Sequence, residues 1–273
     1  MVDENGEPHE MVQVHEHGFV KLLDVMGDDE EVETAARISY GEGTRKVSQT
    51  RNLIRYLMRH RHTSPFEMCE VKFHLKLPIF IMRQLVRHRT ANLNEYSGRY
   101  SVMSDVFYLP QGDYLAKQST TNNQGRGEVL PNKGSLQFEF NRIYDGALMA
   151  YQNLLEEDLA REVARAVLPV ANYTECIWKI DLNNFFHFVK LRSDKHAQRE
   201  IRDFSDTMYE LVKPKFPLCC EAFEDYIRDA VTFSKQEMEL IKEAIWDGRG
   251  GLDTESEKLG KRETKEFLKK IGD

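Results

Sequence analysis

The chain has 273 residues, of which 41% are hydrophobic and 30% are charged, and its formal net charge is -7. This length and apolar content allow a packed core in one large domain or two small ones. The acidic balance argues against general binding to nucleic acids or anionic membranes, so an anion site requires a local cluster of arginines. No apolar run reaches the ~20 residues of a membrane helix, no leader opens the chain, and the four cysteines lack paired spacing. We therefore expect a cytoplasmic protein with no membrane partner and no nucleic-acid partner.

The N-terminal third alternates predicted strands and helices. Residues 1–16 are polar, which predicts a mobile lead-in before a strand over 18–26. The acidic run that starts at Asp28 predicts a helix to about Ile38, ended by glycines at 41 and 43. Apolar side chains at helical spacing predict another helix over 48–61. Residues 69–77 alternate strictly between apolar and polar side chains, the pattern of a strand with one buried face.

Pro78 ends this strand and begins a helix that leads into residues 87–100. In that segment Asn92, Asn94 and Ser97 favour turns, which predicts a loop. Beyond it the pattern predicts a surface excursion over 108–135, a helix over 136–158 and a shorter helix that ends at 167. A strand over 173–180 and a helix over 182–191 follow. Ser193 or Asp194 is predicted to cap the next helix, which continues through 208.

These elements predict an α+β fold, with a mainly antiparallel sheet covered on one face and a large helical part. The predicted organisation is a lead-in over 1–16, a single catalytic domain over 17–235 and a charged helical extension over 236–273.

The segment from Arg87 to Tyr100 concentrates polar chemistry, with three arginines, a histidine, a glutamate and a serine. Guanidinium groups at 87, 89 and 99 suit bidentate contact with phosphate, and Ser97 with the amides around Gly98 adds short donors. These groups outline an anion site. The alternative is a solvated basic loop whose arginines pair with some of the 45 acidic residues.

Arg87-His88-Arg89, seven further residues and then Ser97-Gly98-Arg99-Tyr100 resemble the defining motif of the flavin-dependent thymidylate synthases. Many members of that family carry serine where this chain has Asn92, a change that a turn tolerates. The resemblance extends over roughly residues 17–230 and includes segments 62–67, 78–80, 83–84, 162–165, 168–169, 191–194 and 197–198.

The resemblance implies a set of site residues. Contacts with deoxyuridylate (dUMP) are implied for Gln84, Leu85, Val86, Arg87, Glu95, Tyr96, Ser97, Gly98, Arg99, Arg165 and Arg192. Contacts with FAD are implied for Ser64, Arg87, His88, Arg89, Glu95, Asp181, Leu182, Asn183 and His187. His62 and Tyr100 are implied on the folate side. Some relatives carry arginine at 183 and asparagine at 187.

The resemblance also implies a reaction. Methylenetetrahydrofolate donates a methylene group to C5 of dUMP, reduced FAD supplies the hydride, and NADPH reduces the flavin. Arg192 takes the catalytic role of favouring ionisation at N3 of the uracil, which raises electron density at C5. Family members are homotetramers of α+β subunits that share their active sites.

Three other site types fit the sequence less well. His60 and His62 point to different faces of a helix and no paired ligand motif completes a metal site. Cys219 and Cys220 lie in an apolar stretch with no nearby cation to activate a thiol, so we expect core residues rather than a nucleophile. No GxGxxG motif follows a predicted strand. A non-catalytic nucleotide- or RNA-binding module that uses the Arg87–Arg99 loop is the remaining alternative.

Overall fold

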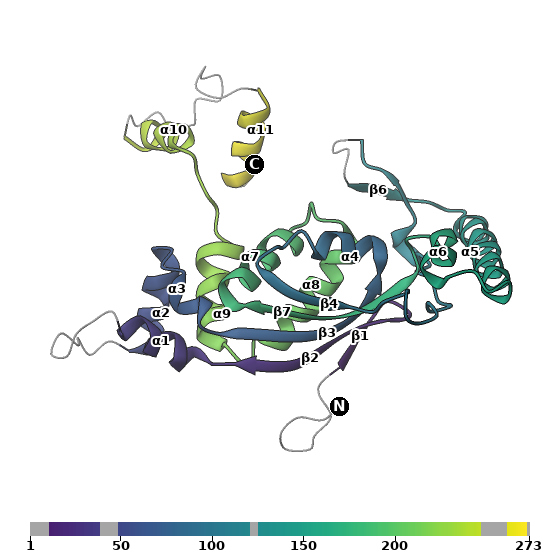
Figure 1. Cartoon of the computed structure of the whole chain (residues 1–273). Coiled ribbons are helices and arrows are strands. Elements are labelled where there is room, and N and C mark those ends of the chain that lie inside the picture. Colours follow the sequence, from purple (N-terminus) through teal and green to yellow (C-terminus); the bar gives the residue numbers. More distant parts are fainter. Residues whose placement is uncertain (1–10, 39–48, 121–124, 247–260, 272–273) are drawn as a thin grey trace. The chain divides into compact units, whose positions relative to one another are not determined.

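The computed structural model describes residues 11–38, 49–120, 125–246 and 261–271 (Figure 1). The chain forms two compact units, Met1–Phe223 and Glu224–Asp273. This boundary lies before the one predicted after residue 235. The predicted helix end at Gly41 and Gly43 lies outside the described residues.

The first unit is built on a five-stranded antiparallel sheet with the order β1-β2-β3-β7-β4. The strands are β1 (Met11–Val14), β2 (Gly18–Met26), β3 (Glu70–Pro78), β7 (Tyr173–Asp181) and β4 (Ala91–Glu95). The mainly antiparallel sheet is therefore confirmed. Within the predicted lead-in over 1–16, Met11–Val14 is a strand, and that part of the prediction was wrong. Four residues are too short for a readable period, and backbone pairing with β2 makes them a strand.

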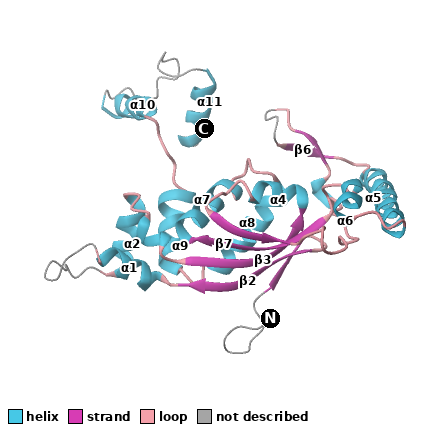
Figure 2. Cartoon of the chain, viewed as in Figure 1, coloured by secondary structure: helices cyan, strands magenta, loops and turns pink. Residues whose placement is uncertain are grey.

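Strand β3 places its apolar side chains on the covered face of the sheet. Val71, Phe73, Leu75 and Leu77 are fully buried, while the alternate position His74 pairs with a neighbour on β7. Helices α4 (Ile79–Leu85), α7 (Leu182–Arg192) and α8 (Arg199–Val212) pack against the sheet (Figure 2). The predicted α+β layer structure is confirmed, and packing against the sheet fixes the positions of the helix ends.

A small helical group lies at the N-terminal side of the chain: α1 (Asp29–Arg37), α2 (Thr50–Arg59) and α3 (Ser64–Glu67), with α9 (Pro217–Phe223) packed against α1 and α2. The Asp28 side chain caps α1 by accepting hydrogen bonds from the backbone N–H groups of Glu30 and Glu31. Asp29 accepts from the backbone N–H groups of Leu218 and Cys219, at 2.7 and 2.9 Å, and so caps α9 from another helix.

The predicted surface excursion over 108–135 is mostly exposed in its described residues, and it contains regular structure that was not predicted. It holds the 3-10 turn η1 (Gly112–Tyr114) and a hairpin of β5 (Ala116–Gln118) and β6 (Arg126–Val129). Arg126 and Asp113 pair with Glu200 and Arg199 of α8. These long-range ion pairs cannot be read from local turn residues. Helices α5 (Lys133–Glu156) and α6 (Arg161–Ala164) follow, and then η2 (Arg165–Val167).

Helix α8 begins at Arg199 after Gln198, so the predicted cap by Ser193 or Asp194 was wrong. Ser193 is instead the C-cap of α7, and its hydroxyl bonds to that of Ser205. Asp194 accepts from the backbone N–H of His196 in the connecting loop. Helix α7 includes Arg192 as its last residue, one residue beyond the predicted helix end at 191.

The second unit contains η3 (Glu224–Arg228), α10 (Lys235–Trp246) and α11 (Lys261–Ile271). Leu240 and Phe267 are buried, and Lys270 pairs with Glu237 at 2.7 Å. Across both units, none of the described helices has the length and hydropathy needed to cross a membrane.

Candidate active site

The strand β4 divides the arginine-rich motif into two parts. Arg87–Arg89 precede the strand and Ser97–Arg99 follow it, and five residues of strand span ~16 Å. The predicted loop was therefore wrong for Ala91–Glu95, because hydrogen bonds to β7 outweigh the turn preferences of the two asparagines. One chain consequently does not gather the whole motif around a single phosphate.

Arg192 and His88 form the centre of the first part. The Arg192 Nε–H donates to His88 Nε2 at 3.0 Å, and a second guanidinium nitrogen lies 3.5 Å from the backbone oxygen of Gln84. Burial, with the positive charges of Arg192 and His187, lowers the pKa of His88 to about 4. His88 is therefore neutral near pH 7, with its proton on Nδ1, and acts as an acceptor for Arg192.

Helix α4 ends beside this pair, and its packing determines which of the neighbouring side chains are exposed to a ligand. Leu85 is 1% exposed, so its side chain belongs to the core and only its backbone is available to a ligand. Val86, Arg87 and Arg89 are exposed. The Gln84 side chain is half-buried and donates to Gln198 at 2.6 Å.

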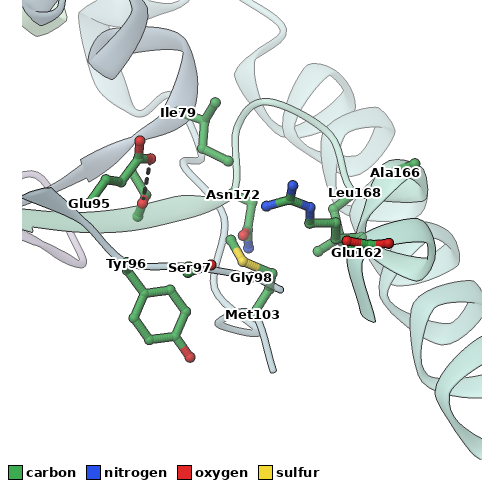
Figure 3. Close-up of a pocket in the computed structure, with 12 residues that line it drawn as sticks. Ile79, Glu95, Tyr96, Ser97, Gly98, Met103, Glu162, Ala166, Leu168 and Asn172 are labelled. Carbon is green, nitrogen blue, oxygen red and sulfur yellow. Dashed lines mark hydrogen bonds between the residues drawn. The ribbon is translucent and has the colours of Figure 1, made fainter. Parts of the chain in front are cut away.

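The second part borders a cavity of about 580 Å³ at the far end of β4 (Figure 3). Residues of β4 and the following turn form one side, and Glu162 and Leu168 form the other. Arg165 is the cation among the described lining residues. The lining residues are Ile79, Glu95, Tyr96, Ser97, Gly98, Met103, Glu162, Arg165, Ala166, Leu168, Asn172 and Thr174. Arg87 and Arg192 are not among them.

Short-range contacts shape the turn that follows β4. Glu95 accepts a hydrogen bond from the Thr174 hydroxyl at 2.9 Å, and Ser97 Oγ accepts from the backbone N–H of Arg99 at 3.3 Å. A Cβ on Gly98 would lie 2.5 Å from the Met103 sulfur, so a larger residue there would have to displace the Met103 side chain.

Helix α6 holds the loop that carries Arg99 and Tyr100. Arg99 pairs with Glu162 at 2.9 Å, and Arg161 donates to the backbone oxygen of Tyr100 at 2.8 Å. The Tyr100 side chain is exposed. These partners on α6 were not predicted from the sequence, because no local pattern pairs residues 60 positions apart.

Four of the implied flavin residues lie on α3 or at the start of α7, namely Ser64, Asp181, Leu182 and Asn183. Helix α3, which begins at Ser64, packs against α7. Asp181 caps α7 by accepting from the backbone N–H of Asn184 at 2.9 Å. Leu182 is fully buried, so only its backbone can contact a ligand, while Asn183 is half-buried. The helix separates this group from Arg192 by ~16 Å.

His62 lies on an exposed aromatic cluster at the end of α2. Its ring centroid is 5.7 Å from that of Tyr56 and 6.3 Å from that of His60. Arg61 has a φ of 58°, and the next backbone N–H, that of His62, donates to Leu57 at 2.9 Å. This left-handed helix end turns His62 back over the last turn of α2.

The cysteines do not supply a nucleophile in this structure. All four are buried, as predicted for Cys219 and Cys220. Burial raises the pKa of Cys69 to about 11 and that of Cys176 to about 12, and it raises the pKa of Cys219 well above its usual value. Among the described residues, no cluster of histidine, cysteine, aspartate and glutamate has the arrangement of a metal site.

The sheet is covered on one face, and arginines are exposed at helix and strand ends. Hydroxyl and amide donors border a cavity, and the thiols are buried. These features define a protein that binds small anionic ligands. The sequence profile of the thymidylate synthase complementing protein family matches residues 21–218. The chain belongs to this family, whose curated relatives are flavin-dependent thymidylate synthases.

Three such relatives illustrate the similarity. The flavin-dependent thymidylate synthase of Wolbachia pipientis wMel is 46% identical over 95% of this chain and 92% of its own length. Those of Ehrlichia ruminantium (strain Gardel) and Dictyostelium discoideum are 48% and 47% identical, over 96% and 95% of this chain and 88% and 86% of their own lengths. Among solved structures, the UMP/dUMP methylase PolB from Streptomyces cacaoi bound with 5-Br dUMP is 33% identical. It covers 80% of this chain and 99% of its own, with a TM-score of 0.73.

Proposed function

We propose that this protein is a flavin-dependent thymidylate synthase that converts dUMP to dTMP. The observation that carries the proposal is the pair of Arg192 and neutral His88, beside the arginine-rich motif of a chain 46–48% identical to enzymes of that name. The proposed one-carbon donor is methylenetetrahydrofolate. Residue assignments and cofactors beyond the flavin are part of this proposal.

Arg192 is the proposed catalytic residue. A half-buried guanidinium stabilises negative charge on a uracil ring more strongly than one in water, because the local dielectric is lower. Charge on the ring raises the nucleophilicity of C5, which then attacks the methylene carbon without an enzyme thiolate. His88 accepts from Arg192 Nε and the Gln84 backbone oxygen lies 3.5 Å from one terminal nitrogen, so the other terminal nitrogen is left to face the ring.

Donor groups on α3 and in the first part of the motif fit a flavin. The Ser64 hydroxyl, the exposed Arg87 and Arg89 and the neutral His88 offer hydrogen bonds to phosphate and ring atoms, although Leu182 can contribute only through its backbone. When bound, FAD supplies the hydride, and we propose NADPH as its reductant. On the proposed folate side, His62 and Tyr100 present exposed rings.

We further propose a homotetramer in which neighbouring subunits complete each site. The separation of the two motif parts by β4 supports this, because a second chain can bring its Ser97–Arg99 turn to Arg87 and Arg192. Strand β4 is at the sheet edge and mostly exposed. Helix α5 also exposes Phe138 and Met149 at 63% and 61%, and because they are about three helical turns apart they lie on one side of the helix, where a neighbouring subunit could pack.

The proposal is tested by anaerobic incubation of the purified protein with dUMP, methylenetetrahydrofolate, FAD and NADPH, followed by assay for dTMP. We expect dTMP only when every component is present. A protein that binds dUMP without flavin and without dTMP formation would instead support the non-catalytic binding module.

We propose a cytoplasmic location, because its reducing setting suits the four buried cysteine thiols. Localisation of the tagged protein in cell fractions tests it.

A further inference from the structure

A chain of side-chain hydrogen bonds connects the proposed dUMP residue Gln84 to a buried carboxylate on α8. Gln84 Nε2 donates to Gln198 Oε1 at 2.6 Å, and Gln198 Nε2 donates to Glu200 Oε2 at 3.0 Å. We call these three residues the amide relay. Gln198 was noted in the sequence only as part of a resemblance, and Glu200 was not singled out.

Glu200 is held as an anion in the interior. It is 2% exposed, and its Oε1 accepts from the Tyr108 hydroxyl at 3.0 Å and from the Arg126 guanidinium. Burial raises its pKa, but the hydrogen bond and charge of Arg126 outweigh burial and the net pKa shift is downward. An ionised carboxylate can only accept hydrogen bonds.

This restriction fixes the direction of both amides. Because Glu200 cannot donate, Gln198 must turn its NH₂ group toward Glu200 and its oxygen toward Gln84. Gln84 must then turn its own NH₂ group toward Gln198, which leaves its Oε1 for another partner. No described residue hydrogen-bonds to that oxygen.

We propose that Glu200 is a positioning residue, which acts through Gln198 to make Gln84 present a hydrogen-bond acceptor to the nucleotide. This inference rests on the proposed function. The complementary ligand group is the 3′-hydroxyl of dUMP, because the proposed role of Arg192 leaves N3 of the ring ionised and without a proton to donate. Because Arg126 belongs to β6, the hairpin of the 108–135 segment supports the site without touching the nucleotide.

A double-mutant cycle on the flavin-loaded protein tests the relay, with dUMP binding measured by calorimetry. Gln198→Met removes the link while Glu200 keeps Tyr108 and Arg126. We expect it to weaken dUMP binding about 10-fold, the effect of one well-placed hydrogen bond, and to leave flavin affinity unchanged. In a Gln84→Met background, Gln198→Met should have almost no further effect on dUMP binding, because the side chain through which Gln198 acts is already absent.

Two matched variants separate this role from general damage to the fold. Gln137→Met removes a half-buried glutamine that donates to Pro110 outside the relay and should leave dUMP affinity unchanged. Arg126→Met should weaken dUMP binding and Arg126→Lys should partly restore it, whereas Lys117→Met, which breaks the Lys117–Glu128 pair on the same hairpin, should not.

A third arm identifies the donor on the nucleotide. If the 3′-hydroxyl is this donor, the Gln198→Met penalty should disappear with 2′,3′-dideoxyuridylate, and a penalty that persists would overturn the hydroxyl as the partner of Gln84. Equal effects of Gln198→Met in both backgrounds, with dUMP bound by wild type, would overturn the relay alone. A wild type that does not bind dUMP would overturn the proposed function and the relay with it.

Discussion

Arg192 and His88 show how two residues 104 positions apart determine one another's chemistry. Burial and the charge of the arginine keep the histidine neutral, and the neutral histidine orients the arginine. Neither group has this property in an isolated peptide, where the histidine titrates near pH 6.5.

Arg192→Ala should lower turnover by ~10²–10³ while flavin affinity changes little, because the lost guanidinium stabilises charge on the uracil. Arg192→Lys should be intermediate, since an ammonium keeps the charge but loses the planar fork. Single-turnover dTMP formation and flavin titration measure the two effects. Unchanged turnover in Arg192→Ala would remove Arg192 from the catalytic role.

His88 should make stability depend on pH in acid. Its pKa in the folded protein, about 4, lies below the value of 6.5 for an unperturbed histidine, so between these values the unfolded state binds more protons. Stability should therefore fall as pH decreases from about 6.5 toward about 4 and be unaffected by this group above that window. Urea midpoints of wild type and His88→Gln across this range isolate the contribution. Parallel curves for the two proteins would contradict it.

At the scale of elements, helix ends are stabilised by other parts of the chain. Asp29 belongs to α1 and yet satisfies the first free amides of α9, which begins with a proline and supplies no cap of its own. The same dependence occurs where α6 holds the turn after β4. Such contacts fix the position of each segment relative to the sheet.

Asp29→Ala should lower the free energy of unfolding by about 2–3 kcal/mol, because it removes two charge-assisted hydrogen bonds and leaves buried amides without partners. Asp29→Asn should cost about 1 kcal/mol, since an amide oxygen can still accept. Chemical denaturation measures both, with the exposed Glu30→Ala as control. An Asp29→Ala protein as stable as that control would show that the cap contributes nothing.

At the scale of the whole molecule, the proposed site is larger than one chain supplies. The two motif parts lie at opposite ends of β4, and large apolar side chains on α5 are exposed. The proposed tetramer would account for both features, because it would cover α5 and join the motif parts across subunits.

Phe138→Lys combined with Met149→Lys should therefore shift the protein to a smaller species in sedimentation velocity and lower dTMP formation. The cause is the cost of burying two ammonium groups in an apolar interface. Met26→Lys replaces a methionine of similar exposure on β2 and should leave the oligomer intact. A wild-type monomer that binds flavin and forms dTMP would refute shared sites.

The sequence by itself determined the elements with long, regular periods. Strict alternation predicted β3, helical spacing predicted α2 and α5, and the resemblance of Arg87–Tyr100 to a known motif indicated the family. These signals are local, because backbone geometry places every second or every third to fourth side chain on one face. The buried state of Cys219 and Cys220 was predicted for the same reason.

Only the tertiary structure decided what depends on distant partners. The turn-forming asparagines of β4 lie in a strand because β7 pairs with them, and strand β6 is tied to α8 because Arg126 pairs with Glu200. Glu200 looks like an ordinary surface carboxylate in a charged helix until the fold buries it among Tyr108, Arg126 and Gln198. Burial and hydrogen-bond partners arise from contacts between segments far apart in the sequence, and local pattern carries no record of them.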